Sequence, residues 1–319
     1  MAILSIARLT YVEALRQPLG LVLALILGIL ALFSPSFTSF TLGKGVDLLR
    51  SNLLSTLMIG GVIFASLLST ALIQRDLQRK TLLTILSRPV GIPTYYFGKW
   101  IGIAGLLLHF WFVMVGVCWT AMVIGTPDTN GTVHNFLPLI VLGSGLLLIS
   151  ILALALNYTF DTPIVSFIFT GWAIWTPVSI FAGLLLSSTF KLPLPSIAAF
   201  GQFLMASLLV GAMILVVASF AMALSTVTSP VANTVLCLLF LLLSLMTPGL
   251  ESMASQSHPW LEMAAKVLPD FHLLWTADWL SLERSIPLEH IAGSLLYSMS
   301  LIASFSFMGV HAMMRKEFS

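Results

Sequence analysis

Residues 100–124 read WIGIAGLLLHFWFVMVGVCWTAMVI, an apolar run in which His109 is the one side chain that titrates near neutral pH. A helix needs about 20 apolar residues to cross the hydrocarbon core of a bilayer. Because lipid offers the backbone no hydrogen-bond partners, a crossing segment must satisfy its own backbone groups within a helix. The run therefore predicts a membrane-spanning α-helix.

Seven further apolar blocks accompany this run along the chain. They cover residues 18–33, 53–73, 137–156, 164–186, 197–224, 231–246 and 291–314. Pro163 disfavours helix at Thr162, which predicts a tight turn between the fourth and fifth blocks. We expect about eight spans, with six as the alternative.

The composition agrees with a membrane protein. Hydrophobic residues make up 58% of the 319-residue chain and charged residues only 8%, against about 25% charged in a soluble domain. The alternating segments of an outer-membrane β-barrel are absent from the sequence. The fold class is thus all-α: a polytopic transmembrane helical bundle forming a single domain over residues 1–319.

The basic residues predict the orientation of this bundle. With the N-terminus in the cytoplasm, nine of the 14 Lys and Arg residues fall on the cytoplasmic side, as the positive-inside rule requires. Both termini are then cytoplasmic, and the number of spans is even. Residues 1–17 form an amphipathic cytoplasmic N-terminus, 74–99 a cytoplasmic loop, and 247–289 an external segment with short interfacial helices.

The cytoplasmic loop between the second and third blocks is the most informative polar segment. Leu82, Ile85 and Leu86 recur at helical spacing between basic residues, which predicts a short amphipathic helix. Arg88-Pro89 should end this helix, since proline disfavours α geometry in the residue before it. Such a helix could lie on anionic lipid headgroups or dock a soluble partner, and its physics permits both.

The chain that follows leads into the third span. We expect Pro93 to keep the backbone extended. Tyr95, Tyr96 and Trp100, together with Lys99, are expected to anchor the span at the membrane–water boundary.

The same loop carries a recognisable order of residues. It contains Arg75-Asp76, Arg79-Lys80-Thr81, Leu82-Leu83, Leu86-Ser87-Arg88-Pro89-Val90 and then Gly98-Lys99. This order resembles the coupling loop of the ABC-2 family of ABC transporter permeases, and the resemblance covers roughly residues 44–103. The chain departs from the family where Gln78 replaces a second acid and where Gly91-Ile92-Pro93 follows Val90.

The resemblance implies a mechanism and a set of partners. The loop helix would be a coupling helix that docks on a separate cytoplasmic ATPase, and two permease copies, or this chain and a homologous permease, would pair. ATP would be bound by the partner subunit, and transport, in the export direction, would take place in a bacterial cytoplasmic (inner) membrane. The positions implied to contact the ATPase are Arg75, Asp76, Arg79, Lys80, Thr81, Leu82, Leu83, Leu86, Ser87, Arg88 and Pro89. Six spans are usual in the family, which would make residues 137–186 an extra hairpin.

Other chemistry has little support in the sequence. No Gly-x4-Gly-Lys-Ser/Thr loop is present to bind nucleotide phosphates, so we expect no enzymatic activity and no cofactor in this chain. Cys118 and Cys237 are isolated and the histidines scattered, which does not fit a metal site. We expect His109 to be neutral and to hydrogen-bond a neighbouring helix. Membrane lipids are expected partners, and nucleic acid is not.

Two other function classes remain as alternatives. A secondary transporter usually places paired charges or broken helices near the midplane, and here the apolar blocks are almost free of charge. A membrane scaffold without transport activity is the third class. Gly98, Gly102 and Gly105 would serve close helix packing in any of the three.

Overall fold

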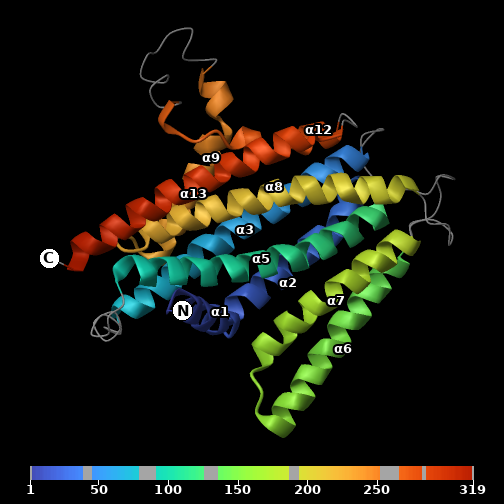
Figure 1. Cartoon of the computed structure of the whole chain (residues 1–319). Coiled ribbons are helices and arrows are strands. Elements are labelled where there is room, and N and C mark those ends of the chain that lie inside the picture. The colour runs from blue at the N-terminus through green and yellow to red at the C-terminus, as the bar shows by residue number, and fades with distance from the viewer. Residues whose placement is uncertain are drawn as a thin grey trace.

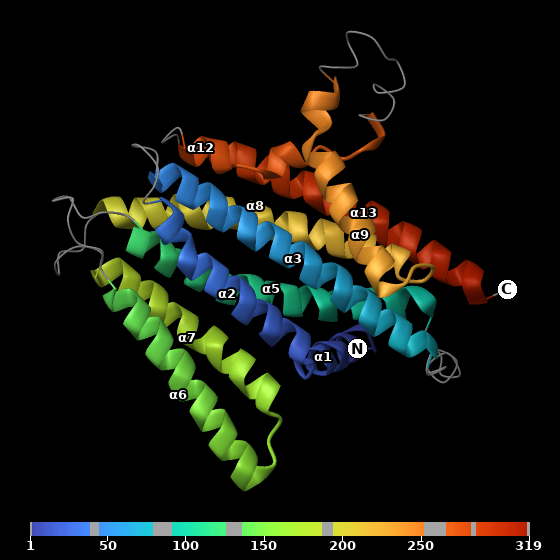
Figure 2. The same ribbon diagram turned by 180° about the vertical axis from the view of Figure 1, so that it is seen from behind.

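The computed structural model describes residues 2–38, 45–78, 91–125, 136–186, 194–251, 266–281 and 285–317. Within these ranges the chain forms helices and no strands. The long helices run side by side, and both termini lie toward the end of the bundle at which α3 ends and α5 begins (Figure 1 and Figure 2). We call this end the base of the bundle.

Every apolar block of the sequence coincides with a helix. The described elements are α1 (Ala2–Leu15), α2 (Pro18–Thr38), α3 (Gly45–Gln78), α5 (Ile92–Gly125), α6 (Leu137–Phe160), α7 (Ile164–Leu186), α8 (Leu194–Leu224), α9 (Pro230–Leu245), the 3-10 helix η1 (Phe271–Leu274), α12 (Ala277–Ser281) and α13 (Leu288–Glu317).

Seven of the described helices are long and apolar enough to cross a membrane: α2, α3, α5, α6, α7, α8 and α13. The eighth apolar block is α9, whose 16 residues extend about 24 Å at 1.5 Å per residue. That is short of a hydrocarbon core about 30 Å thick. The protein is an all-α, polytopic integral membrane protein, as the sequence predicts.

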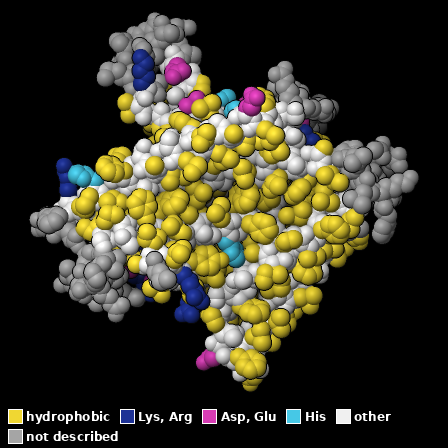
Figure 3. Space-filling view, in the orientation of Figure 1, with side chains coloured by type: hydrophobic (Ala, Val, Ile, Leu, Met, Phe, Trp, Pro, Cys, Tyr) yellow, Lys and Arg dark blue, Asp and Glu magenta, His cyan; other side chains and the backbone are white. Residues whose placement is uncertain are grey.

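The centre of the bundle is formed by α3, α5 and α8, which are the most buried of the seven long helices. Large side chains fill the space between them, among them Phe64 of α3, Phe110 of α5 and Phe203 of α8. The helices α2, α9 and α13 pack around this centre and leave apolar side chains on the outside. Hydrophobic side chains cover the face seen in Figure 3, as a lipid environment requires.

The helices α6 and α7 form a hairpin at the side of the bundle. They diverge from the other helices toward the turn that joins them (Figure 1 and Figure 2). At that turn Asp161 adopts a left-handed backbone with φ of 56° and ends α6, a conformation that aspartate tolerates better than most residues. Trp175 of α7 packs on Gly145 of α6 and donates a hydrogen bond to the Val141 carbonyl at 3.1 Å.

A buried polar network joins α3, α8 and α9. The Asn233 amide of α9 donates hydrogen bonds to the Thr70 hydroxyl of α3 and, at 2.9 Å, to the Ala221 carbonyl of α8. The Ser66 hydroxyl of α3 donates to Thr234 of α9 at 3.1 Å. These bonds hold the short helix α9 in register against its two neighbours.

The described parts of the external segment 247–289 pack into the bundle. Phe271, Leu274 and Ala277 are buried. The backbone N–H of Asp270 donates to the Tyr297 hydroxyl at 2.9 Å, and Arg50 of α3 donates to the Leu280 carbonyl at 3.1 Å. Two short helical pieces, η1 and α12, lie in the segment where the sequence predicts short interfacial helices.

One expectation for the start of the third span is wrong. Pro93 lies in the first turn of α5 and does not extend the chain, because a proline there loses only an N–H that would have no helical partner. Tyr95, Tyr96 and Lys99 are the residues expected to anchor this span at the membrane–water boundary. They are buried inside the bundle, and Trp100 is half-buried and donates to the Ser219 hydroxyl of α8 at 2.8 Å.

Candidate functional site

The structure places the predicted partner-binding residues in two groups. Arg75 and Asp76 lie in the last turn of α3 and are described. The other nine lie outside the described residues: Arg79, Lys80, Thr81, Leu82, Leu83, Leu86, Ser87, Arg88 and Pro89. The site can therefore be built only from the two helices that flank this segment.

A buried ion pair connects those two helices. The Lys99 ammonium of α5 lies 2.7 Å from a carboxylate oxygen of Asp76 of α3, and their side chains are only 7% and 13% exposed. The Tyr95 hydroxyl of α5 donates a hydrogen bond to the same carboxylate. Since a buried ion is tolerated only with such partners, Asp76 depends on both α5 side chains.

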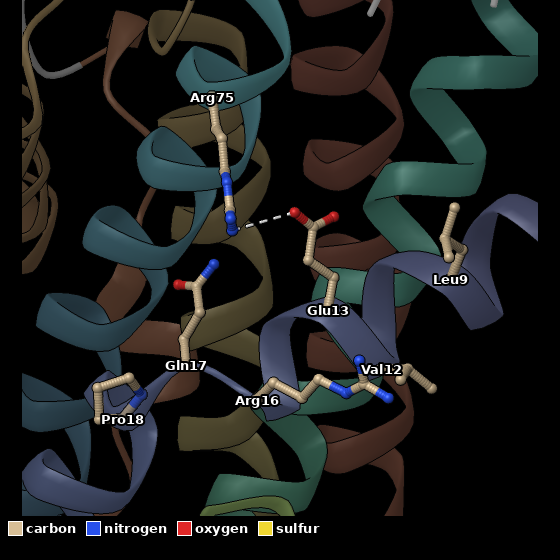
Figure 4. Close-up of a pocket in the computed structure, with 7 residues that line it drawn as sticks. All are labelled: Leu9, Val12, Glu13, Arg16, Gln17, Pro18 and Arg75. Atoms are coloured by element: carbon tan, nitrogen blue, oxygen red, sulfur yellow. Dashed lines mark ion pairs between the residues drawn. The ribbon is translucent and has the colours of Figure 1, made fainter. Parts of the chain in front are cut away.

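A third helix adds a further acid. Glu13 of α1 lies 3.2 Å from the Arg75 guanidinium and 3.9 Å from the Lys99 ammonium. Figure 4 shows Arg75 reaching from α3 toward Glu13 on α1. We call Glu13, Arg75, Asp76, Tyr95 and Lys99 the base cluster. With two acids and two bases it is neutral in formal charge.

The helix geometry explains why these residues meet. Because α3 and α5 run antiparallel, the last turn of α3 lies beside the first turns of α5. Tyr95 and Lys99 are four residues apart and so share one face of α5. That face points toward α3, and Asp76 is the α3 residue that lies opposite Tyr95 and Lys99 and contacts both.

A stripe of glycines on α5 holds α1 in place. A Cβ at Gly98 would lie 2.8 Å from Ile6, and one at Gly102 would lie 2.7 Å from the Ala7 carbonyl oxygen. Gly105 continues the stripe beneath the ring of Tyr11. This confirms the packing role predicted for these glycines, and the close approach brings Glu13 to the cluster.

A second polar contact pins α1 deeper in the bundle. The Tyr11 hydroxyl and His109 Nδ1 are 2.9 Å apart, and His109 Nε2 is 3.0 Å from the Phe169 carbonyl of α7. A carbonyl only accepts, so Nε2 carries the proton and Nδ1 accepts from Tyr11. Burial raises the pKa of Tyr11, which keeps its hydroxyl a donor. His109 thus hydrogen-bonds neighbouring helices, as predicted.

A cavity of about 550 Å³ opens beside the base cluster. It lies where α1 ends and α2 begins. Glu13, Arg16 and Gln17 line it from that junction, and Arg75 lines it from α3. Figure 4 shows Gln17 and Arg75 pointing into the same space, with Arg16 extending beside Val12.

The base cluster is suited to mechanical linkage. It ties the end of α3, the start of α5 and the end of α1 by charge-assisted contacts, which are stronger than neutral hydrogen bonds.

Among the described residues no group of three or more His, Cys, Asp or Glu side chains is placed to hold a metal ion. Cys118 and Cys237 are both buried and free.

Three members of this cluster were not among the predicted site residues. Glu13 was not singled out, although it is the one acid of the first 46 residues. Tyr95 and Lys99 were assigned to a membrane boundary, although their spacing of four residues places both on one helix face. Comparison of the chain with protein-family models and with curated proteins found no match.

Proposed function

We propose that this chain is the membrane-spanning permease subunit of an ABC transporter of the ABC-2 type, driven by a separate cytoplasmic ATPase. The observation that carries the proposal is the base cluster. It joins the two helices that are connected by residues 79–90, the segment with the strongest resemblance to a coupling loop.

The cluster gives the proposed coupling a physical route. A push on residues 79–90 reaches the end of α3 and the start of α5 at the same time. Separating Lys99 from Asp76 would break a buried ion pair at a cost of roughly 3–5 kcal/mol. The two helix ends therefore move together, and α1 follows because Glu13 contacts both Arg75 and Lys99.

Roles follow for the residues of the loop. Leu82, Leu83 and Leu86 supply an apolar anchor for the groove of the ATPase, and Arg79, Lys80 and Arg88 supply charge complementarity. Arg75 and Asp76 hold the root of the loop through the base cluster. ATP chemistry belongs to the partner, and a second permease copy or a homologous permease completes the transporter. The proposed location is a bacterial cytoplasmic membrane, with export as the direction.

The test is co-purification with candidate ATPase subunits from the same cell. We expect Leu86→Asp and Arg88→Glu to abolish ATPase capture and transport. Val227→Asp and Arg315→Glu are matched controls, since both residues are exposed and lie at other places in the chain. If no ATPase is captured, or if all four variants behave as the wild type, the proposal is wrong.

A secondary transporter is the second candidate. It is favoured by the buried Lys99–Asp76 pair, because titratable groups inside a membrane domain are common parts of proton pathways. Reconstitution of the chain alone in liposomes separates the two functions. Uptake driven by a proton or sodium gradient, without ATP or a second subunit, would support the secondary transporter.

A further inference from the structure

A second cavity of about 420 Å³ lies between α1 and α7, next to the cavity beside the base cluster. The two linings share Val12 and Arg16. The second cavity is lined by residues of α7 and of the turn before it, part of the hairpin that diverges from the bundle in Figure 1. Both volumes fall in the range of ligand-binding pockets, about 300–1,000 Å³.

The two cavities differ in chemistry. The first contains two guanidinium groups, Arg16 and Arg75, against the single carboxylate of Glu13. The second is walled mainly by apolar side chains such as Leu15, Phe167 and Ile174. A ligand that fills both must therefore have a polar end and an apolar end.

The charges of the first cavity favour an anion at the polar end. Glu13 is engaged by Arg75 at 3.2 Å and by Lys99 at 3.9 Å. Arg16 is exposed, and among the described residues no carboxylate forms an ion pair with it. Its guanidinium is free to make the paired hydrogen bonds that phosphate accepts.

The position of the site matches a lipid in the membrane. Pro18 begins the first membrane-spanning helix, so Arg16 lies just outside the hydrocarbon region. Ile174 belongs to a spanning helix and is 72% exposed. The polar cavity is thus at headgroup level, and the apolar cavity is within reach of acyl chains.

We propose that the two adjoining cavities bind an anionic phospholipid, with its phosphate at Arg16 and Arg75 and one acyl chain passing over Val12 into the groove between α1 and α7. The lipid would fill the wedge between the hairpin and the bundle and so hold α7 against α1. This site shares Arg75 with the residues predicted to contact the ATPase, whereas Arg16 and the groove lie outside that set. Its occupancy does not depend on a partner subunit.

Lipid titration of the purified, delipidated full chain tests the proposal. We would add dioleoyl phosphatidylglycerol, dioleoyl phosphatidylcholine and glycerol phosphate in separate experiments and measure retention by native mass spectrometry. We expect saturable binding of the phosphatidylglycerol alone. Arg16→Gln should weaken it about fivefold, the effect of one basic residue near an anionic surface, and Ile174→Trp should block the groove.

Two substitutions serve as matched controls. Arg8→Gln removes an exposed arginine of α1 that does not line either cavity, and Ile151→Trp enlarges an exposed side chain on the neighbouring helix α6. Neither should change the affinity. Equal binding of both lipids, equal binding of glycerol phosphate alone, or equal effects of Arg16→Gln and Arg8→Gln would each overturn the proposal.

Discussion

Replacement of Lys99 by methionine is the sharpest test of the base cluster. The substitution keeps the length and apolar stem of the side chain and removes its charge. Asp76 would then be a buried carboxylate with Tyr95 as its remaining α5 contact. At the 2.7 Å separation and an effective dielectric constant of about 20, the lost attraction is about 6 kcal/mol.

Part of that attraction only offsets the desolvation of the two ions, so the net effect is smaller. Breaking one side of a buried pair costs roughly 3–5 kcal/mol, and we expect Lys99→Met to lower the free energy of unfolding by that amount. Asp76→Asn should cost less, because Lys99 retains Glu13 at 3.9 Å. The double variant Lys99→Met/Asp76→Asn removes both charges, and the asparagine oxygen can still accept the hydrogen bond from Tyr95. Its loss of stability should be smaller than the sum of the two single losses by about 2 kcal/mol or more.

Unfolding in mixed micelles titrated with sodium dodecyl sulfate, followed by tryptophan fluorescence, measures these differences. Asp47→Asn is the matched control for Asp76→Asn, because both residues belong to α3. Asp47 pairs with Arg50 at 3.6 Å, and its side chain is 34% exposed. Exposed pairs contribute about 1 kcal/mol or less. The reasoning is refuted if the losses of the two single variants simply add in the double variant, or if Asp47→Asn costs as much as Lys99→Met.

Three further changes test the contacts around the site. Gly102→Ala should destabilise the protein by roughly 1–3 kcal/mol and make α1 more sensitive to proteolysis, because the added Cβ would clash with α1. Gly143→Ala is the control: its Cβ would point into open space, and neither stability nor proteolysis should change. Asn233→Ala should cost about 1–2 kcal/mol in the same unfolding assay, since its amide bonds to α3 and α8 are each modest inside a membrane. Burial raises the pKa of Tyr11, so its neutral hydroxyl stabilises the fold below pH 10 and this contribution is lost as the pH rises further. Stability curves of the wild type and Tyr11→Phe should therefore converge at alkaline pH, and a constant difference would contradict this.

The positions of the helices were predictable from the sequence, but their ends were not. A membrane span is a local property, because lipid selects about 20 consecutive apolar residues whatever the rest of the chain does. The ends of α3 and α5 continue past their apolar blocks, to Gln78 and back to Ile92. Polar side chains in those turns, Asp76, Tyr95 and Lys99, are buried against other helices, and this packing favours helix there.

The base cluster was predictable only in part. Arg75, Asp76 and Lys99 belonged to the sequence pattern of the loop, although the pattern gave no indication that they contact one another. Glu13 lies far from its partners along the chain, and its place depends on how closely α1 approaches α5. That approach is set by Gly102 and its neighbouring glycines, whose importance is visible only once the packing is known.

The distribution of polar contacts indicates which helix–helix interfaces would move under the proposed mechanism. The base cluster ties α1, α3 and α5, and the network around Asn233 ties α3 to α8 and α9. The α6–α7 hairpin meets this unit largely through apolar side chains, with the His109 bond to the Phe169 carbonyl as a polar contact. Apolar helix contacts in lipid gain little over contacts with lipid tails. A displacement of the α3–α5 root should therefore be taken up between the hairpin and the rest of the bundle, which includes the α1–α7 groove in which we place the lipid.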